Sequence, residues 1–176
     1  MGPMTGGMAA FDTALGTCAI RWTAAGIASV RLPSPKTETL PRVDTVALPE
    51  AVRDAIAGIV AVLDGRTADL RGIQLDEAGI EPRRRQVYAA TREVPPGSTV
   101  TYGQIARAIG RTMPEAAREV GAALAGNPFP IVVPCHRVVG ANGRLTGFSA
   151  PGGLETKRRM LALEGAPGYG QLGLFD

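Results

Sequence analysis

The stretch Pro134-Cys135-His136-Arg137-Val138 lies inside an apolar run that extends from Ile131 to Gly140. It contains one of the two cysteines of the chain and its only histidine. A thiol is a good nucleophile only as the thiolate, and an adjacent base or cation is the usual means of forming one. The pattern predicts a nucleophilic Cys135 with His136 as its base, although a cysteine that merely packs in a core would give the same pattern.

The composition is that of a globular protein with one or two domains. Of 176 residues, 45% are hydrophobic and 20% are charged, which suits a chain with its own hydrophobic core. No apolar run approaches about 18 residues, so we expect no transmembrane helix. With two cysteines and one histidine at no repeated spacing, we expect no disulfide framework, no metal site, no cofactor and a cytoplasmic location.

Charge is distributed unevenly along the chain. Residues 1–81 carry 7 Lys and Arg against 10 Asp and Glu, whereas residues 82–176 carry 12 against 6. The part that holds Cys135 is therefore the basic part, and a basic surface favours an anionic partner. Nucleic acid is the first candidate, and an ordinary solvated surface is the alternative.

Residues 1–81 predict a small α/β domain with an antiparallel sheet. Phe11–Leu32 alternates as a β-hairpin does, with Ala24-Ala25-Gly26 as the turn. A helix is expected over Pro49–Leu63, where apolar residues recur on one face, and Leu70–Leu75 is a candidate for one more strand. Residues 1–8 lack the pattern of a signal peptide, and we expect a disordered leader there.

Residues 82–176 predict a mainly helical domain. Helices are expected over Pro82–Arg92, Tyr102–Ile109, Glu115–Ala125 and Leu154–Leu163. The second and third are joined by a short turn that contains glycine, which is the helix-turn-helix pattern. The fold class that follows is a two-domain α/β protein, with a helix-turn-helix and the reactive cysteine in the C-terminal domain.

The second helix of this pair consists almost entirely of small residues. Ala117 and Gly121 are typical of its residues, and Arg118 is its one long basic residue. Small side chains let a helix backbone approach a DNA groove closely, with Arg118 as a probe. The alternative is that the small residues face another helix and Arg118 is simply solvated.

The motifs together resemble the O6-alkylguanine-DNA alkyltransferases, the methylated-DNA–protein-cysteine methyltransferases. The resemblance rests on the pentapeptide 134–138, on Gly126-Asn127-Pro128 before it, and on Ala117-Arg118-Glu119-Val120-Gly121. It extends from about Gln86 to Gly165, and the N-terminal part is compatible with the first domain of that family. It implies a suicide repair protein that flips a damaged guanine out of duplex DNA and takes its alkyl group irreversibly.

The resemblance also implies roles for the residues around the thiol. Cys135 would be the alkyl acceptor. His136 would draw off its proton through a water molecule, and Glu164 would orient the imidazole. Asn127 would tether the recognition helix to the active-site segment.

Further residues would contact DNA by the same resemblance. Arg118 would fill the gap left in the base stack, and Tyr102 would help to turn the 3′ phosphate. Arg137, Ala117 and Gly121 would belong to the same DNA-binding surface, which this family places in the minor groove.

Three residues would bind the damaged guanine. Val138 and the backbone at Ser149 would contact its edge, and Phe148 would stack on it. Many members of the family have tyrosine at the position of Phe148, and the loop 149–153 looks about two residues longer than their commonest form.

The partner implied is double-stranded DNA that contains alkylated guanine, with O4-alkylthymine left open, and the protein is expected to be a monomer. One alternative is a damage-recognition module that binds alkylated DNA without transfer, against which Cys135 argues. A transcription regulator or a cysteine hydrolase would be other classes. The chain has no room for a second DNA-binding domain, and nothing in it suggests an acyl substrate.

Overall fold

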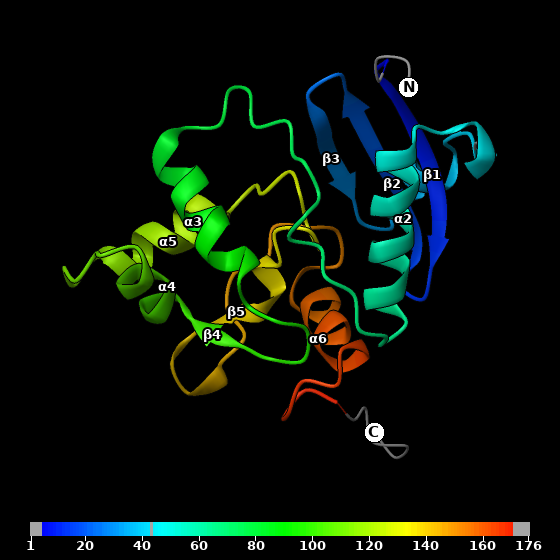
Figure 1. The fold of residues 1–176 in the computed structure, drawn as a ribbon. Helices are drawn as coiled ribbons and strands as arrows, with labels where there is room; N and C mark the ends of the chain where they lie inside the picture. The colour runs from blue at the N-terminus through cyan, green and yellow to red at the C-terminus, as the bar shows by residue number, and fades with distance from the viewer. Residues whose placement is uncertain (1–4, 43, 171–176) are drawn as a thin grey trace.

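The computed structural model describes residues 5–42 and 44–170 (Figure 1). Its N-terminal part is a three-stranded antiparallel sheet in the order β1-β2-β3. The strands are β1 (Gly7–Thr13), β2 (Gly16–Thr23) and β3 (Gly26–Arg31). The predicted hairpin is therefore confirmed as β2 and β3, and β1 is an addition to it.

Strand β1 corrects the expectation of a disordered leader. Gly7 and Met8 pair with Trp22 and Arg21 of β2, and the Trp22 indole donates to the carbonyl of Thr5 at 2.6 Å. The sequence pattern missed this because the strand begins in a glycine-rich segment, where alternation is weak. Residues 1–4 lie outside the described part of the chain.

Helix α2 (Glu50–Leu63) covers one face of the sheet (Figure 1). The predicted apolar stripe is its buried face, on which Val52, Ile59 and Leu63 are fully buried. The segment before it contains the short helix α1 (Pro35–Glu38) and the 3-10 turn η1 (Thr45–Ala47).

The strand expected at Leu70–Leu75 does not form. Leu70 and Ile73 close a turn, in which the amide of Ile73 donates to the carbonyl of Leu70. Only one isolated parallel bridge, between Leu75 and Ile27, connects this segment to β3. A turn that contains Gly72 uses the backbone groups that a longer ladder would need.

The C-terminal part is built from the four predicted helices. They are α3 (Pro82–Arg92), α4 (Tyr102–Ala108), α5 (Ala116–Leu124) and α6 (Gly153–Leu163). Helix α4 begins with a capping box, in which Thr101 and Gln104 each bind the backbone amide of the other. Helices α4 and α5 pack together as the predicted helix-turn-helix.

A two-stranded parallel ladder joins the helix-turn-helix to the cysteine segment. It pairs β4 (Val100–Thr101) with β5 (Val138–Val139), Val100 against Val138. Between α5 and β5 the chain forms the 3-10 turn η2 (Cys135–Arg137), and the 3-10 turn η3 (Ala141–Gly143) follows β5. Because β4 directly precedes α4 and β5 directly follows η2, the ladder holds the start of α4 next to the cysteine segment.

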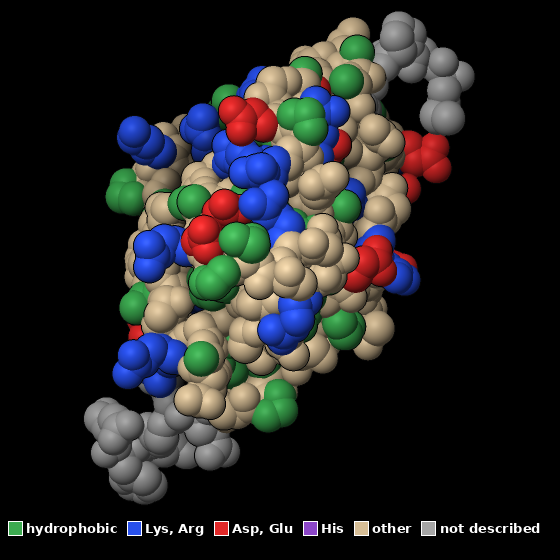
Figure 2. Space-filling model, turned by 90° about the vertical axis from the view of Figure 1, so that its left-hand side faces the viewer, with side chains coloured by type: hydrophobic (Ala, Val, Ile, Leu, Met, Phe, Trp, Pro, Cys, Tyr) green, Lys and Arg blue, Asp and Glu red, His purple; other side chains and the backbone are tan. Residues whose placement is uncertain are grey.

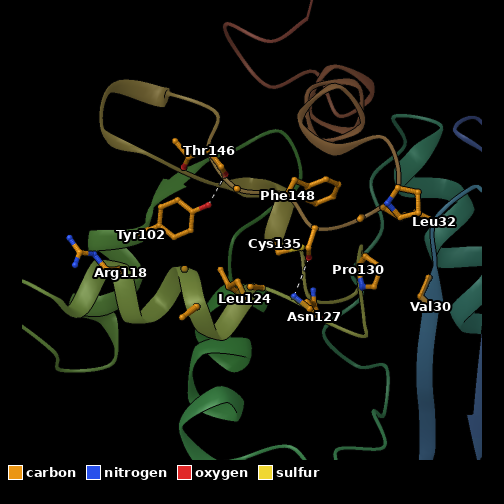
Figure 3. Close-up of a pocket in the computed structure, with 18 of the residues that line it drawn as sticks. Val30, Leu32, Tyr102, Arg118, Leu124, Asn127, Pro130, Cys135, Thr146 and Phe148 are labelled. Carbon is orange, nitrogen blue, oxygen red and sulfur yellow. Dashed lines mark hydrogen bonds between the residues drawn. The ribbon is translucent and has the colours of Figure 1, made fainter.

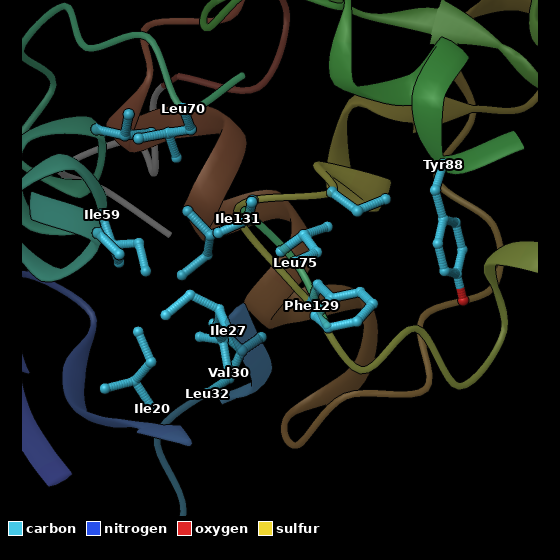
Figure 4. Packing of buried hydrophobic residues seen from close by; sticks show 14 of the residues in the cluster. Ile20, Ile27, Val30, Leu32, Ile59, Leu70, Leu75, Tyr88, Phe129 and Ile131 are labelled. Atoms are coloured by element: carbon cyan, nitrogen blue, oxygen red, sulfur yellow. The ribbon is translucent and has the colours of Figure 1, made fainter. Parts of the chain in front are cut away.

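One hydrophobic cluster runs through both parts of the molecule (Figure 4). Ile27 and Val30 of β3 lie in the same cluster as Phe129 and Ile131 of the cysteine segment. Complete burial of such a side chain contributes about 1.5–3 kcal/mol. The predicted boundary between residues 81 and 82 directly precedes α3, and the shared core holds the two parts against each other.

Candidate active site

The sulfur of Cys135 faces a cavity of about 820 Å³ (Figure 3). Cys135 opens the turn η2, and its amide donates to the carbonyl of Val133 at 2.7 Å. The residue is partly exposed although its chain neighbours Pro134 and His136 are buried. The tight turn therefore presents the thiol, alone in this segment, to the cavity.

Most of the site residues predicted from the sequence line this cavity. Those that do so are Tyr102, Ala117, Arg118, Gly121, Asn127, Cys135, Phe148 and Ser149. The others, His136, Arg137, Val138 and Glu164, lie behind the thiol or beside it. The fold thus separates the predicted set into a cavity wall and a buried support.

His136 and Glu164 form a buried pair. Their side chains are 0% exposed, and His136 Nε2 lies 2.7 Å from Glu164 Oε1. Glu164 immediately follows α6 and acts as its C-cap residue, so this helix carries the carboxylate back to η2. The other ring nitrogen, Nδ1, is buried and has no hydrogen-bond partner among the described residues.

Arg137 has a different place from the DNA contact expected for it. Its side chain is only 5% exposed, and its guanidinium binds both carboxylate oxygens of Glu164, with one contact at 2.7 Å. It also donates to the carbonyl of Val94 at 2.7 Å. Because the guanidinium is buried and occupied, we do not assign Arg137 to the DNA surface; it holds the carboxylate that holds the imidazole.

Two opposing effects act on Glu164. Burial raises the pKa of a carboxyl group, but the His136 ring and the Arg137 guanidinium outweigh it and lower the pKa of Glu164 to about 2. Burial lowers the pKa of His136. The pair therefore combines an ionised carboxylate with a neutral imidazole at neutral pH, and this imidazole is able to accept a proton.

Asn127 ties the turn after α5 to the cysteine segment. Its amide nitrogen donates to the carbonyl of Val133 at 2.9 Å, and its amide oxygen accepts from the amide of Phe129 at 2.9 Å. Burial raises the pKa of the Cys135 thiol, and a hydrogen bond from Asn127 acts in the opposite direction. Asn127 thus supports both the shape of the segment and the thiolate.

Lys157 is a buried cation near the thiol that sequence reasoning missed. Its ammonium group donates to the carbonyls of Val138 at 2.7 Å and Thr146 at 3.1 Å, and to the Tyr102 hydroxyl at 3.4 Å. Burial lowers its pKa to about 8, and the charge of Cys135 opposes this shift. Lys157 lies three and four residues before the buried Met160 and Leu161 of α6, on the same face of the helix. This spacing in the sequence could have indicated that Lys157 is buried.

Of the three residues expected to bind guanine, Phe148 and Ser149 line the cavity and Val138 does not. Phe148 lies above Cys135 in Figure 3. Ser149 follows it in the chain, and the Ser149 hydroxyl accepts a hydrogen bond from the amide of Gly126 at 3.1 Å. Val138 is fully buried and is not part of the cavity lining. Because the Val138 side chain is buried, any contact between Val138 and a base would involve its backbone. The carbonyl of Val138 already accepts a hydrogen bond from Lys157.

Helix α5 borders the mouth of the cavity. Arg118 is exposed on it, and Gly121 lies under the ring of Tyr102, where a Cβ atom would be 3.8 Å from that ring. Glu119, the acidic neighbour of Arg118, is paired with Arg111. Figure 2 shows the side of the molecule on which α4 and α5 lie, with Lys and Arg more prominent than Asp and Glu.

These features define a class of protein. A helix-turn-helix leads into a cavity that ends at a thiol, and a buried imidazole and carboxylate lie beside that thiol. No helix among the described residues is both long and apolar enough to cross a bilayer. The class is that of DNA-binding proteins with a reactive cysteine in a cavity beside the helix-turn-helix.

Comparison with known proteins makes the class specific. Residues 82–166 match the family described as 6-O-methylguanine DNA methyltransferase, DNA binding domain. A methylated-DNA–protein-cysteine methyltransferase of Mycolicibacterium paratuberculosis is 45% identical over 128 residues, 73% of this chain and 74% of that protein. One from Salmonella typhimurium is 44% identical over 119 residues, 67% of this chain and 62% of that protein.

Solved structures agree with this match. The crystal structure of Mycobacterium tuberculosis OGT in complex with DNA has a TM-score of 0.72 and 34% identity, covering 92% of this chain and 96% of that one. The chain belongs to the methylated-DNA–protein-cysteine methyltransferase family. The likeness also confirms the predicted fold class, a small antiparallel sheet with helices followed by a helical C-terminal part.

Proposed function

We propose that the protein repairs DNA by moving the alkyl group of O6-alkylguanine in duplex DNA onto the sulfur of Cys135. The observation that carries this proposal is the position of that sulfur. It faces a cavity that opens beside α5, and the next residue in the chain, His136, forms a buried pair with Glu164. Membership of the methyltransferase family supports the same reaction.

The reaction needs one displacement and two proton transfers, one from the thiol and one to the guanine that leaves. His136 Nδ1 accepts the thiol proton through a bridging water, and the sulfur attacks the alkyl carbon. A bond forms between sulfur and carbon while the bond between that carbon and O6 breaks. Guanine leaves with the bonding electrons and takes up a proton, so the net products are a thioether and unmodified guanine.

DNA engagement follows from the surface around the cavity. The guanine must leave the stack to reach Cys135, which costs a few kcal/mol for unstacking. Arg118 is exposed on α5 at the cavity, and it would fill the gap in the stack. Tyr102, at the start of α4, lines the same cavity and would help to turn the 3′ phosphate of the flipped nucleotide.

A thioether cannot revert to a thiol with the groups present, so one molecule repairs one lesion. We propose that the protein does this as a monomer in the cytoplasm, with O6-alkylguanine as the main substrate and O4-alkylthymine as a second one to be tested. Residues 82–166, which match the family's DNA-binding domain, would supply the contacts to double-stranded DNA.

The test is transfer from a duplex that contains one O6-methylguanine. Protein in excess should convert all lesions to guanine and gain one methyl group in the peptide that contains Cys135. If the lesion is bound but the protein mass does not change, the protein is a damage-recognition module instead. Methylation at the buried Cys18 would contradict the assignment of the acceptor.

A further inference from the structure

The cavity has two different ends (Figure 3). Tyr102 and Arg118 lie on one side of Cys135, toward the helix-turn-helix. Pro130, Val30 and Leu32 lie on the other side. A guanine that enters from the side of α5 reaches the sulfur first, and whatever its reacting carbon carries must then lie beyond or beside the sulfur.

The far end is built from the N-terminal sheet. Val30 belongs to β3, pairs with Ile20 of β2, and donates its amide to the carbonyl of Pro128 at 2.9 Å. This hydrogen bond fixes the strand against the segment that leads to Cys135. The strand end is therefore a firm part of the cavity wall, even though it is distant in sequence.

The far end is mostly apolar. Val30 is 3% exposed and Leu32 is 2% exposed, so both side chains are held in the packed core while they border the cavity. Arg31, between them, is exposed and also lines the cavity, so one charged side chain adjoins this apolar pair. Apolar side chains in fixed positions accept a hydrocarbon group without unpaired polar atoms.

The cavity extends to both sides of Cys135, from α5 to the end of β3. Its total volume of about 820 Å³ is near the upper part of the range of about 300–1,000 Å³ in which proteins hold drug-sized ligands. The part on the side of Val30 and Leu32 is the space that a substituent larger than methyl would enter. The loop that contains Phe148 covers the same cavity from above (Figure 3).

We propose that Val30 and Leu32 form the wall against which large apolar O6 substituents pack, so that the N-terminal sheet sets the alkyl-size preference. The substrate class is O6-alkylguanine with a hydrocarbon group up to the size of benzyl. This inference rests on the proposed function, since it concerns the group that Cys135 accepts. It gives the N-terminal part a role in substrate selection in addition to its role in the core.

The experiment compares two duplexes, one with O6-methylguanine and one with O6-benzylguanine, by single-turnover transfer to Cys135. The wild-type protein should accept both groups. Val30→Leu adds one methylene to the wall and should lower the ratio of the benzyl rate to the methyl rate about tenfold, the lower limit of what one methylene discriminates in an apolar pocket. Leu32→Ala removes part of the wall and should raise that ratio.

Two control variants separate the wall from the core. Val62→Leu and Leu63→Ala make the same changes on α2, where both residues are buried but border no part of the cavity. Both should leave the ratio of rates unchanged. Because Leu32→Ala could also unfold the protein, Val30→Ala is the milder second variant, and thermal unfolding verifies that each variant is folded.

The outcomes distinguish this inference from the proposed function. Transfer of methyl with a ratio that no Val30 or Leu32 variant changes would overturn the role of the wall and leave the repair function intact. Transfer of methyl without any benzyl transfer in the wild type would overturn the proposed substrate class. Absence of transfer from both duplexes would overturn the proposed function itself.

Discussion

His136 Nε2 lies 2.7 Å from Glu164 Oε1, and both side chains are fully buried. A carboxylate at this distance fixes the tautomer of the ring, because Nε2 must carry the hydrogen that it donates. The unprotonated Nδ1 is then the acceptor, and it is the ring atom without a partner in the described structure. The pair therefore leaves Nδ1 as the one ring nitrogen that can accept a proton.

Variants of this pair should slow transfer while leaving DNA binding nearly intact. Glu164→Gln weakens the acceptor for Nε2–H, and His136→Ala removes the base, so the second should be slower than the first. A general base typically contributes about 10²–10⁴-fold in rate. The measurement is the single-turnover rate at saturating protein. Unchanged rates in both variants would mean that another group activates Cys135.

The same carboxylate should make the protein sensitive to acid. The folded-state pKa of Glu164 is about 2 against 4.5 for a free glutamate, so its contribution to stability is present above pH 4.5 and is lost as the pH falls toward 2. A shift of this size corresponds to about 3 kcal/mol. Urea unfolding of wild type and Glu164→Gln between pH 7 and pH 3 measures it. The wild type should lose more stability than the variant over this interval, and parallel curves would contradict the assignment.

Lys157 should make the protein more stable as the pH rises through the alkaline range, because its buried charge is costly. Burial lowers its pKa from 10.5 to about 8, so the cost of the buried charge is fully present below pH 8. The folded state binds fewer protons than the unfolded state between pH 8 and 10.5, and the contribution of Lys157 to stability rises there by about 3 kcal/mol.

Lys157→Met should therefore remove this rise and also slow transfer near neutral pH. The charge of Lys157 is one of the groups that lower the pKa of the Cys135 thiol, and the variant loses it. Denaturant unfolding at pH 7 and pH 9.5, together with transfer rates, measures both effects. If wild type and variant gain stability equally over that interval, the buried ammonium is not the titrating group.

Local signals predicted the C-terminal helices well. Helix ends are marked by residues within three or four positions of one another. Examples are Pro82 at the start of α3, the capping box of Thr101 and Gln104 at the start of α4, and Gly126 after α5. The ladder of β4 and β5 has two residues in each strand, too few for a periodic pattern. Its pairing depends on the tertiary fold alone.

The candidate site shows the same division. The adjacency of Cys135 and His136 is visible in the sequence, whereas the place of Glu164 came from the family resemblance, since 28 residues separate it from His136. Arg137 was assigned to the DNA surface by the same resemblance, and nothing in the sequence shows that its side chain is buried. Its partners Glu164 and Val94 are brought to it by α6 and by the segment after α3.

Arg118→Ala should impair repair more than it impairs binding to undamaged duplex. Arg118 is proposed to stabilise the flipped state, whereas affinity for undamaged DNA comes mainly from phosphate contacts and falls with added salt. Arg53→Ala is the matched control, because Arg53 is exposed on α2 and borders no part of the cavity. Repair at the wild-type rate in Arg118→Ala, or a DNA affinity that does not depend on salt, would contradict this role.

The central claim is that Cys135 is the acceptor of the alkyl group, and intact-mass spectrometry after incubation with excess O6-methylguanine duplex tests it most directly. The wild-type protein should gain one methyl group and no more, located by peptide mapping to Cys135. Cys135→Ser should bind the same duplex and gain none. Turnover beyond one equivalent, or methylation that persists in Cys135→Ser, would contradict the account.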